Sequence, residues 1–172
     1  MKIYFSAPQN TPHERAFVQD CAIGMQSAGF EVYVGSDAYI DHQPAFEVTA
    51  DVDGKAIYSD ENKAGRLAKS PFAREVFLEN YARLAEANLL VALLDGSQVD
   101  DRVATEIGIF YSLARQDESK KGMVGFATDA RCLRRKDSSY GVNIFTLGTL
   151  EEIGKVVEDF DKVLVELKKI AK

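Results

Sequence analysis

Several residue types are scarce in this chain of 172 residues, which contains no tryptophan, two histidines and two cysteines. Two cysteines are too few for a disulfide scaffold and suit a reducing compartment, so we expect a cytoplasmic protein. His13 and His42 form no recognisable ligand set with each other or with a cysteine. The sequence therefore predicts no metal site.

Positive charge is also limited, because 21 Lys and Arg stand against 27 Asp and Glu and give a net charge of -6. Binding to nucleic acid or to anionic lipid needs a basic surface, so we expect neither partner. The longest apolar run, Leu89 to Leu94, is far shorter than the roughly 20 residues of a membrane span. We expect no signal peptide, because the apolar run that follows Lys2 is shorter than the core that a signal peptide requires.

Familiar cofactor and nucleophile motifs are missing as well. The sequence has no GxGxxG run, no Walker A run and no GxSxG elbow. A dinucleotide site, a P-loop nucleotide site and serine-hydrolase chemistry are therefore unsupported, and we expect no cofactor.

The composition is that of an ordinary globular protein, with 46% hydrophobic and 28% charged residues, and the length suits a single domain over residues 1–172. Strand-like and helix-like segments alternate along it. The strands are expected at 2–6, 31–35, 88–94, 122–128 and 142–146. The helices are expected at 11–28, 70–86, 102–115 and 149–171, the last opened by a Thr149–Glu152 capping box.

This alternation predicts an α/β fold with a parallel sheet and helices on both faces. Five strands favour a flavodoxin-like, doubly wound order of 2-1-3-4-5. In such a sheet, ligands bind beyond the carboxyl ends of strands 1 and 3, where the winding reverses. Those ends are Ser6-Ala7-Pro8 and Asp95-Gly96-Ser97, so the sequence directs attention to the stretch from Asp95 to Glu106.

Four carboxylates, Asp95, Asp100, Asp101 and Glu106, fall within twelve residues of this stretch. With Asp101 as N-cap, Glu106 borders the apolar stripe of the next helix, half-buried at the mouth of the crevice. The helix N-terminus would favour its ionised form, which suits a carboxylate nucleophile near acids that donate a proton. The alternative is that Asp100 and Asp101 cap the helix and Glu106 is a surface residue.

Short motifs distributed from residue 2 to residue 148 resemble the nucleoside 2-deoxyribosyltransferase family. The strongest is Leu94-Asp95-Gly96, then Val99-Asp100-Asp101, then Glu106-Ile107-Gly108. Weaker ones are Lys2 to Pro8 with Glu14-Arg15, Thr128 to Arg131, and Asn143 to Leu147. The resemblance implies transfer of a 2-deoxyribosyl group between nucleobases, with nucleosides and nucleobases as small-molecule partners and no metal or cofactor.

The resemblance also implies a role for each matching residue. Glu106 would attack C1' of the sugar, and Asp100 would bind the sugar hydroxyls or orient Glu106. Asn143 would reach the site of a neighbouring subunit in a homo-oligomer. The remaining residues would bind substrate: Tyr4 beside the nucleophile, Ser6 and Ala7 on the floor, Asn80 near the base, and Asp95 and Gly96 in the central motif.

Three features depart from the family pattern. Arg102 stands where the family often has Gly, and we expect it to project into solvent, the alternative being contact with a 5' phosphate. Asn80 stands where some members carry an Asp and cannot donate a proton as an acid, so Asp95, Asp100 or water would protonate the base. Residues 36–69 match no family segment, although Phe46 or Tyr58 could stack on a base.

The same nucleophile would also serve an N-glycosidase, with water accepting the sugar of a nucleoside or nucleotide. A non-catalytic nucleoside-binding domain is a further alternative, because fold alone does not fix function.

Overall fold

The computed structural model describes residues 1–35, 71–132 and 142–171. The chain divides into two compact units, one formed by Met1–Gly35 with Ala82–Lys172 and the other by Ser36–Tyr81. From the second unit, the described part is the beginning of one helix, up to Tyr81. The single domain over residues 1–172 stays a prediction.

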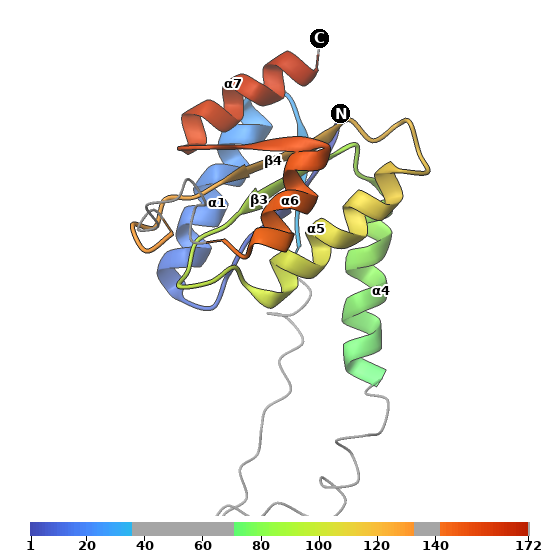
Figure 1. The fold of residues 1–172 in the computed structure, drawn as a ribbon, viewed down its shortest axis with the longest axis horizontal. Coiled ribbons are helices and arrows are strands. Elements are labelled where there is room, and N and C mark those ends of the chain that lie inside the picture. The colour runs from blue at the N-terminus through green and yellow to red at the C-terminus, as the bar shows by residue number, and fades with distance from the viewer. Residues whose placement is uncertain (36–70, 133–141, 172) are drawn as a thin grey trace, which may run out of the picture. The chain divides into compact units, whose positions relative to one another are not determined.

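The first unit is built on a five-stranded parallel sheet (Figure 1). Its strands are β1 (Lys2–Ser6), β2 (Glu31–Val34), β3 (Leu89–Leu93), β4 (Gly122–Phe126) and β5 (Gly154–Val157). Their order is β2-β1-β3-β4-β5, which confirms the predicted flavodoxin-like order. The winding therefore reverses between β1 and β3, as the sequence predicted.

Helices cover both faces of the sheet. They are α1 (Pro12–Ser27), α4 (Pro71–Glu86), α5 (Asp101–Ala114), α6 (Ile144–Glu152) and α7 (Phe160–Ile170). Helices α1 and α7 pack on one face, and α5 and α6 pack on the other (Figure 1). Among the described helices, none combines the length and the apolar character that a membrane span requires.

The alternation of side chains along β1 decides what meets α5. Ile3 and Phe5 belong to the core cluster beneath α1 and α7, and Tyr4 belongs to the cluster beneath α5 and α6. Ser6 follows Tyr4 by two residues and is also fully buried. Two hydroxyl groups therefore point from the end of β1 toward α5.

Local signals explain most helix boundaries. Helix α1 begins with a capping box between Thr11 and Glu14, followed by Pro12 in its first turn. Gly29, with φ of 94°, ends the turn after the helix. The predicted helices at 11–28 and 70–86 are confirmed from Pro12 and Pro71, while Ser70, the expected N-cap of the second, lies outside the described residues.

The segment from residue 142 onward differs from the prediction. Residues 142–146 do not form a strand, because Asn143 caps α6, and the predicted long helix is divided by β5. Thr149 lies inside α6, where its hydroxyl donates to the carbonyl of Phe145 at 2.9 Å, so it opens no helix. Val156 and Val157 instead pair with β4 and complete the sheet. The open edge of β4 offers these β-branched residues ladder hydrogen bonds that a helix would not.

Candidate functional site

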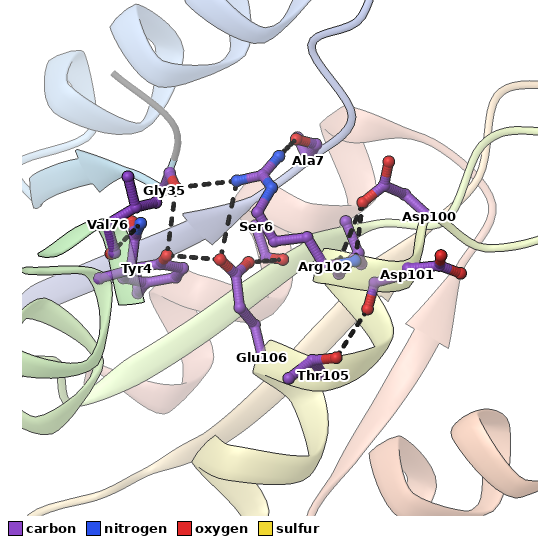
Figure 2. A network of polar contacts seen from close by, with 12 residues as sticks. Tyr4, Ser6, Ala7, Gly35, Val76, Asp100, Asp101, Arg102, Thr105 and Glu106 are labelled. Carbon is purple, nitrogen blue, oxygen red and sulfur yellow. Dashed lines mark hydrogen bonds and ion pairs between the residues drawn. The ribbon is translucent and has the colours of Figure 1, made fainter. Parts of the chain in front are cut away.

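The candidate site lies at the carboxyl end of β1, next to the point where the strand order reverses. Ser6 ends this strand and Ala7 follows it, and α5 begins at Asp101 after the loop that follows β3. Glu106 projects from the second turn of α5 toward the end of β1 (Figure 2).

Glu106 is a buried carboxylate, with 4% of its surface exposed. The hydroxyl of Tyr4 donates to Oε1 at 2.7 Å, and the hydroxyl of Ser6 donates to Oε2. A nitrogen of Arg102 lies 3.6 Å from Oε1 and forms an ion pair (Figure 2). Glu106 is therefore more buried than we predicted, and the alternative of a surface residue is wrong.

Opposing influences act on the protonation of Glu106. Burial raises the pKa of this carboxyl above its usual range, and the nearby charge of Asp100 acts in the same direction. The charge of Arg102 and the hydrogen bonds from Ser6 and Tyr4 act to lower the pKa. The net effect is a raised pKa, so the carboxylate is less readily ionised than the sequence led us to expect.

Tyr4 is held in its protonated form. Burial raises the pKa of the Tyr4 hydroxyl far above its usual range, and the negative charge of Glu106 raises it further. The hydroxyl therefore serves as a hydrogen-bond donor to Glu106. A Cβ atom on Gly35 would overlap the Tyr4 hydroxyl, so a glycine at the end of β2 makes room for this tyrosine.

Arg102 is turned toward the protein, which contradicts the expectation that it projects into solvent. One terminal nitrogen, Nη1, donates to the carbonyl of Gly35 at 2.8 Å, and Nη2 donates to the carbonyl of Ala7 at 2.5 Å. The side chain is 29% exposed. Sequence reasoning missed this role, although its spacing of four residues before Glu106 was a signal, since such residues are neighbours on a helix surface.

Asp100 is the N-cap of α5. Its Oδ1 atom accepts hydrogen bonds from the backbone nitrogens of Arg102 at 2.9 Å and Val103 at 3.3 Å. Asp101 is the first helical residue and is exposed, so its predicted N-cap role is wrong. The extended ψ of Asp100, 136°, places its carboxylate over the free amides of the first turn, which explains the difference.

Asp95 connects the ends of β3 and β4. Its Oδ1 atom accepts from the backbone nitrogens of Thr128 at 2.5 Å and Asp129 at 2.9 Å, and its Oδ2 accepts from the Thr128 hydroxyl at 2.5 Å. Gly96 follows with φ of 129°, where a Cβ would lie 2.6 Å from the carbonyl oxygen of Gln98. Both residues therefore shape the loop, and the four carboxylates do not form one hydrogen-bonded cluster.

Two further predicted residues lie on other helices. Asn80 belongs to the second unit and is described on its own: its amide donates to the carbonyl of Val76 at 2.9 Å. Asn143 is exposed at the start of α6, where its side-chain oxygen accepts from the backbone nitrogen of Phe145 at 2.9 Å. It therefore lies at a helix N-terminus and not in the predicted strand.

Some residues that the sequence singled out lie outside the part of the chain that the structure describes. Residues 36–69, including Phe46 and Tyr58, lie outside the described residues. Within the described ranges, no group of three or more His, Cys, Asp and Glu is arranged to hold a metal ion.

Several solved structures share the fold. A conserved protein from Enterococcus faecalis V583 is 22% identical, with 98% of each chain covered and a TM-score of 0.66. A 2-desoxiribosyltransferase from Leishmania mexicana is 14% identical, with 98% and 97% of the chains covered and a TM-score of 0.59. A CMP N-glycosidase from Clostridium botulinum is 13% identical, with 98% of each chain covered and a TM-score of 0.51. At these identities the likeness shows the fold alone.

The sequence itself carries the family signal. No curated protein matches the chain. The family described as nucleoside 2-deoxyribosyltransferase matches residues 3–165. This match covers nearly the whole chain, including the strands, α5 and the buried Glu106. The chain therefore belongs to the nucleoside 2-deoxyribosyltransferase family.

Proposed function

We propose that the protein transfers a 2-deoxyribosyl group from one nucleobase to another through a covalent bond to Glu106. Membership of the family makes it a glycosyl-transferring enzyme that acts on nucleosides and nucleobases. The observation that carries the proposal is a buried carboxylate held by two hydroxyl groups and one guanidinium at the switch point of the sheet.

The reaction proceeds in two displacements at the same carbon. A carboxylate oxygen of Glu106 attacks C1', the bond from C1' to the base nitrogen breaks, and the electron pair leaves with the base. A nitrogen of the incoming base then attacks C1', the bond from C1' to Glu106 breaks, and its electron pair returns to the carboxylate. The N–H proton of the incoming base passes to the group that protonated the leaving base. Two inversions give net retention, as in retaining glycosidases. The hydroxyls of Tyr4 and Ser6 hold the carboxylate in place during both steps.

Other residues have supporting roles in this proposal. Asp100 uses Oδ1 for its helix cap. Its Oδ2 atom would then bind a sugar hydroxyl or carry the proton that the leaving base accepts. Both oxygens of Asp95 accept hydrogen bonds from the β4 loop, so Asp100 or water is the better candidate for that proton. Asn143 is exposed and thus accessible to a neighbouring copy in a homo-oligomer. Asn80 would contact the base.

Hydrolysis is the second candidate function. The same covalent intermediate would react with water in place of a base. The Clostridium botulinum neighbour is named as an N-glycosidase, which fits this alternative. The outcome depends on how well a second base is held and water is excluded. A site that only binds nucleosides is less well supported, because burying a carboxylate is costly for recognition of a neutral ligand.

A chromatographic assay tests the proposal. Purified protein is incubated with deoxyinosine, alone and then with adenine or cytosine. We expect a new deoxynucleoside only when the acceptor base is present. Hypoxanthine and free deoxyribose formed at the same rate with or without acceptor would favour the hydrolase, and no reaction with nucleosides or their 5'-monophosphates would favour the binding domain.

A pair of variants tests the nucleophile. Glu106→Ala should abolish transfer while the protein remains folded, because no other group replaces the covalent bond to C1'. Asp101→Ala is the matched control, since Asp101 is an exposed carboxylate on the same helix, and it should retain transfer. Near-normal turnover in Glu106→Ala would rule out this mechanism.

A further inference from the structure

The side chain of Arg102 joins three elements of the candidate site. It originates in the first turn of α5, and its terminal nitrogens reach the carbonyl of Ala7 after β1 and the carbonyl of Gly35 after β2. The same Nη1 atom that donates to Gly35 lies 3.6 Å from Oε1 of Glu106 (Figure 2). The planar guanidinium, with its fixed fork of donors, can hold these positions together.

We propose that Arg102 is a positioning residue for the reaction: it fastens the ends of β1 and β2 to α5 and holds a positive charge beside Glu106, so that the carboxylate is ionised when it meets C1'. This inference rests on the proposed role of Glu106 as the nucleophile.

The geometry favours an effect of charge over a direct hydrogen bond. A separation of 3.6 Å is too long for a normal hydrogen bond, whereas an ion pair acts at that distance. The two carbonyl oxygens hold the guanidinium instead, at 2.8 Å and 2.5 Å. Arg102 therefore favours the ionised carboxylate without occupying an oxygen lone pair that must attack the sugar.

The surroundings of Glu106 make this charge important. Within the described part of the chain, Tyr4 and Ser6 face the carboxyl from β1, and Asp100 and Arg102 face it from α5. Arg102 is the cation in this set and Asp100 is an anion. Burial raises the pKa of Glu106, and the charge of Arg102 is the largest influence in the opposite direction.

The test compares three variants. Arg102→Gln keeps a polar side chain and removes the charge, and Arg102→Lys keeps a charge without the planar fork. Arg15→Gln is the matched control, because Arg15 also donates to a carbonyl after β1, that of Gln9 at 3.1 Å, without contacting Glu106. Thermal unfolding of each variant establishes that it is folded.

The first readout does not need turnover. The titration of the Glu106 carboxyl is followed by carbon-13 NMR and assigned by its loss in Glu106→Gln. We expect a higher midpoint in Arg102→Gln than in the wild type, an intermediate midpoint in Arg102→Lys, and no change in Arg15→Gln. This result would support the inference even if the wild type transfers no sugar, in which case the proposed function alone would fail.

The second readout is the pH profile of kcat/KM with a deoxynucleoside. The acidic limb should move to higher pH in Arg102→Gln, because the ionised fraction falls about tenfold for each pH unit below the pKa. The inference would be overturned if the NMR midpoint of Glu106 were unchanged in Arg102→Gln and if Arg102→Gln and Arg15→Gln lost equal stability. A rise in KM confined to 5'-monophosphates, with an unchanged pH profile, would also overturn it and assign Arg102 to a phosphate contact.

Discussion

Replacement of Asp95 by alanine should destabilise the protein through the loop that joins β3 and β4. The carboxylate accepts three hydrogen bonds from Thr128 and Asp129, at 2.5, 2.5 and 2.9 Å. Hydrogen bonds to charged groups contribute about 1.5–3 kcal/mol each in buried settings. Asp95 is only half-buried, so water replaces part of this contribution. We therefore expect Asp95→Ala to lower the free energy of unfolding by about 2–4 kcal/mol.

The corresponding change in melting temperature follows from the size of the protein. For a domain of 150–250 residues, 1 kcal/mol lowers Tm by about 2–4 °C. Asp95→Ala should therefore lower Tm by roughly 4–16 °C, measured by differential scanning calorimetry. Asp95→Asn keeps one acceptor oxygen and should lose less, and Asp101→Ala, which removes an exposed carboxylate, should melt near the wild type.

One result would refute this reasoning about Asp95. If Asp95→Ala melts like the wild type but loses transfer activity, the carboxylate acts on the substrate and does not hold the β4 loop. That outcome would restore the substrate-binding role that the family resemblance implies. Loss of stability with proportionate loss of activity, in contrast, fits the observed hydrogen bonds to Thr128 and Asp129.

Two further predictions concern α5. The pKa of Glu106 is higher in the folded protein than in the unfolded chain. The contribution of the protonated side chain to the free energy of unfolding is therefore complete below the unfolded pKa and is lost as pH rises through the folded pKa. Urea unfolding should therefore show Glu106→Gln more stable than the wild type at neutral pH and closer to it near pH 4; an equal difference at all pH values would contradict this. Asp100→Ala should lose about 1 kcal/mol with its helix cap, while Asp100→Asn should keep the cap. If Asp100→Asn retains stability but loses activity, the charge of Asp100 acts on substrate; equal stability of both variants would argue against the cap.

The sequence alone predicted the order of the sheet, although not the residues of its fifth strand, and it directed attention to the buried Glu106. Alternating strand and helix patterns are local signals, and the handedness of parallel crossovers leaves few topologies. The position of Glu106 on the apolar side of its helix followed from helical periodicity, because Val103 and Ile107 belong to the core beneath α5. The family resemblance added the expected chemistry and the place of Tyr4 beside Glu106, but not the contacts of Arg102.

The tertiary structure decided the features that depend on distant partners. Val156 and Val157 form a strand because β4 has an edge to pair with, although their spacing also fits a helix. Arg102 turns inward because carbonyl groups 67 and 95 residues away in the sequence lie within its reach. Burial raises the pKa of Glu106 only once β1 and α5 are packed together. Patterns within a segment cannot encode these contacts, because each depends on residues that lie far away in the sequence.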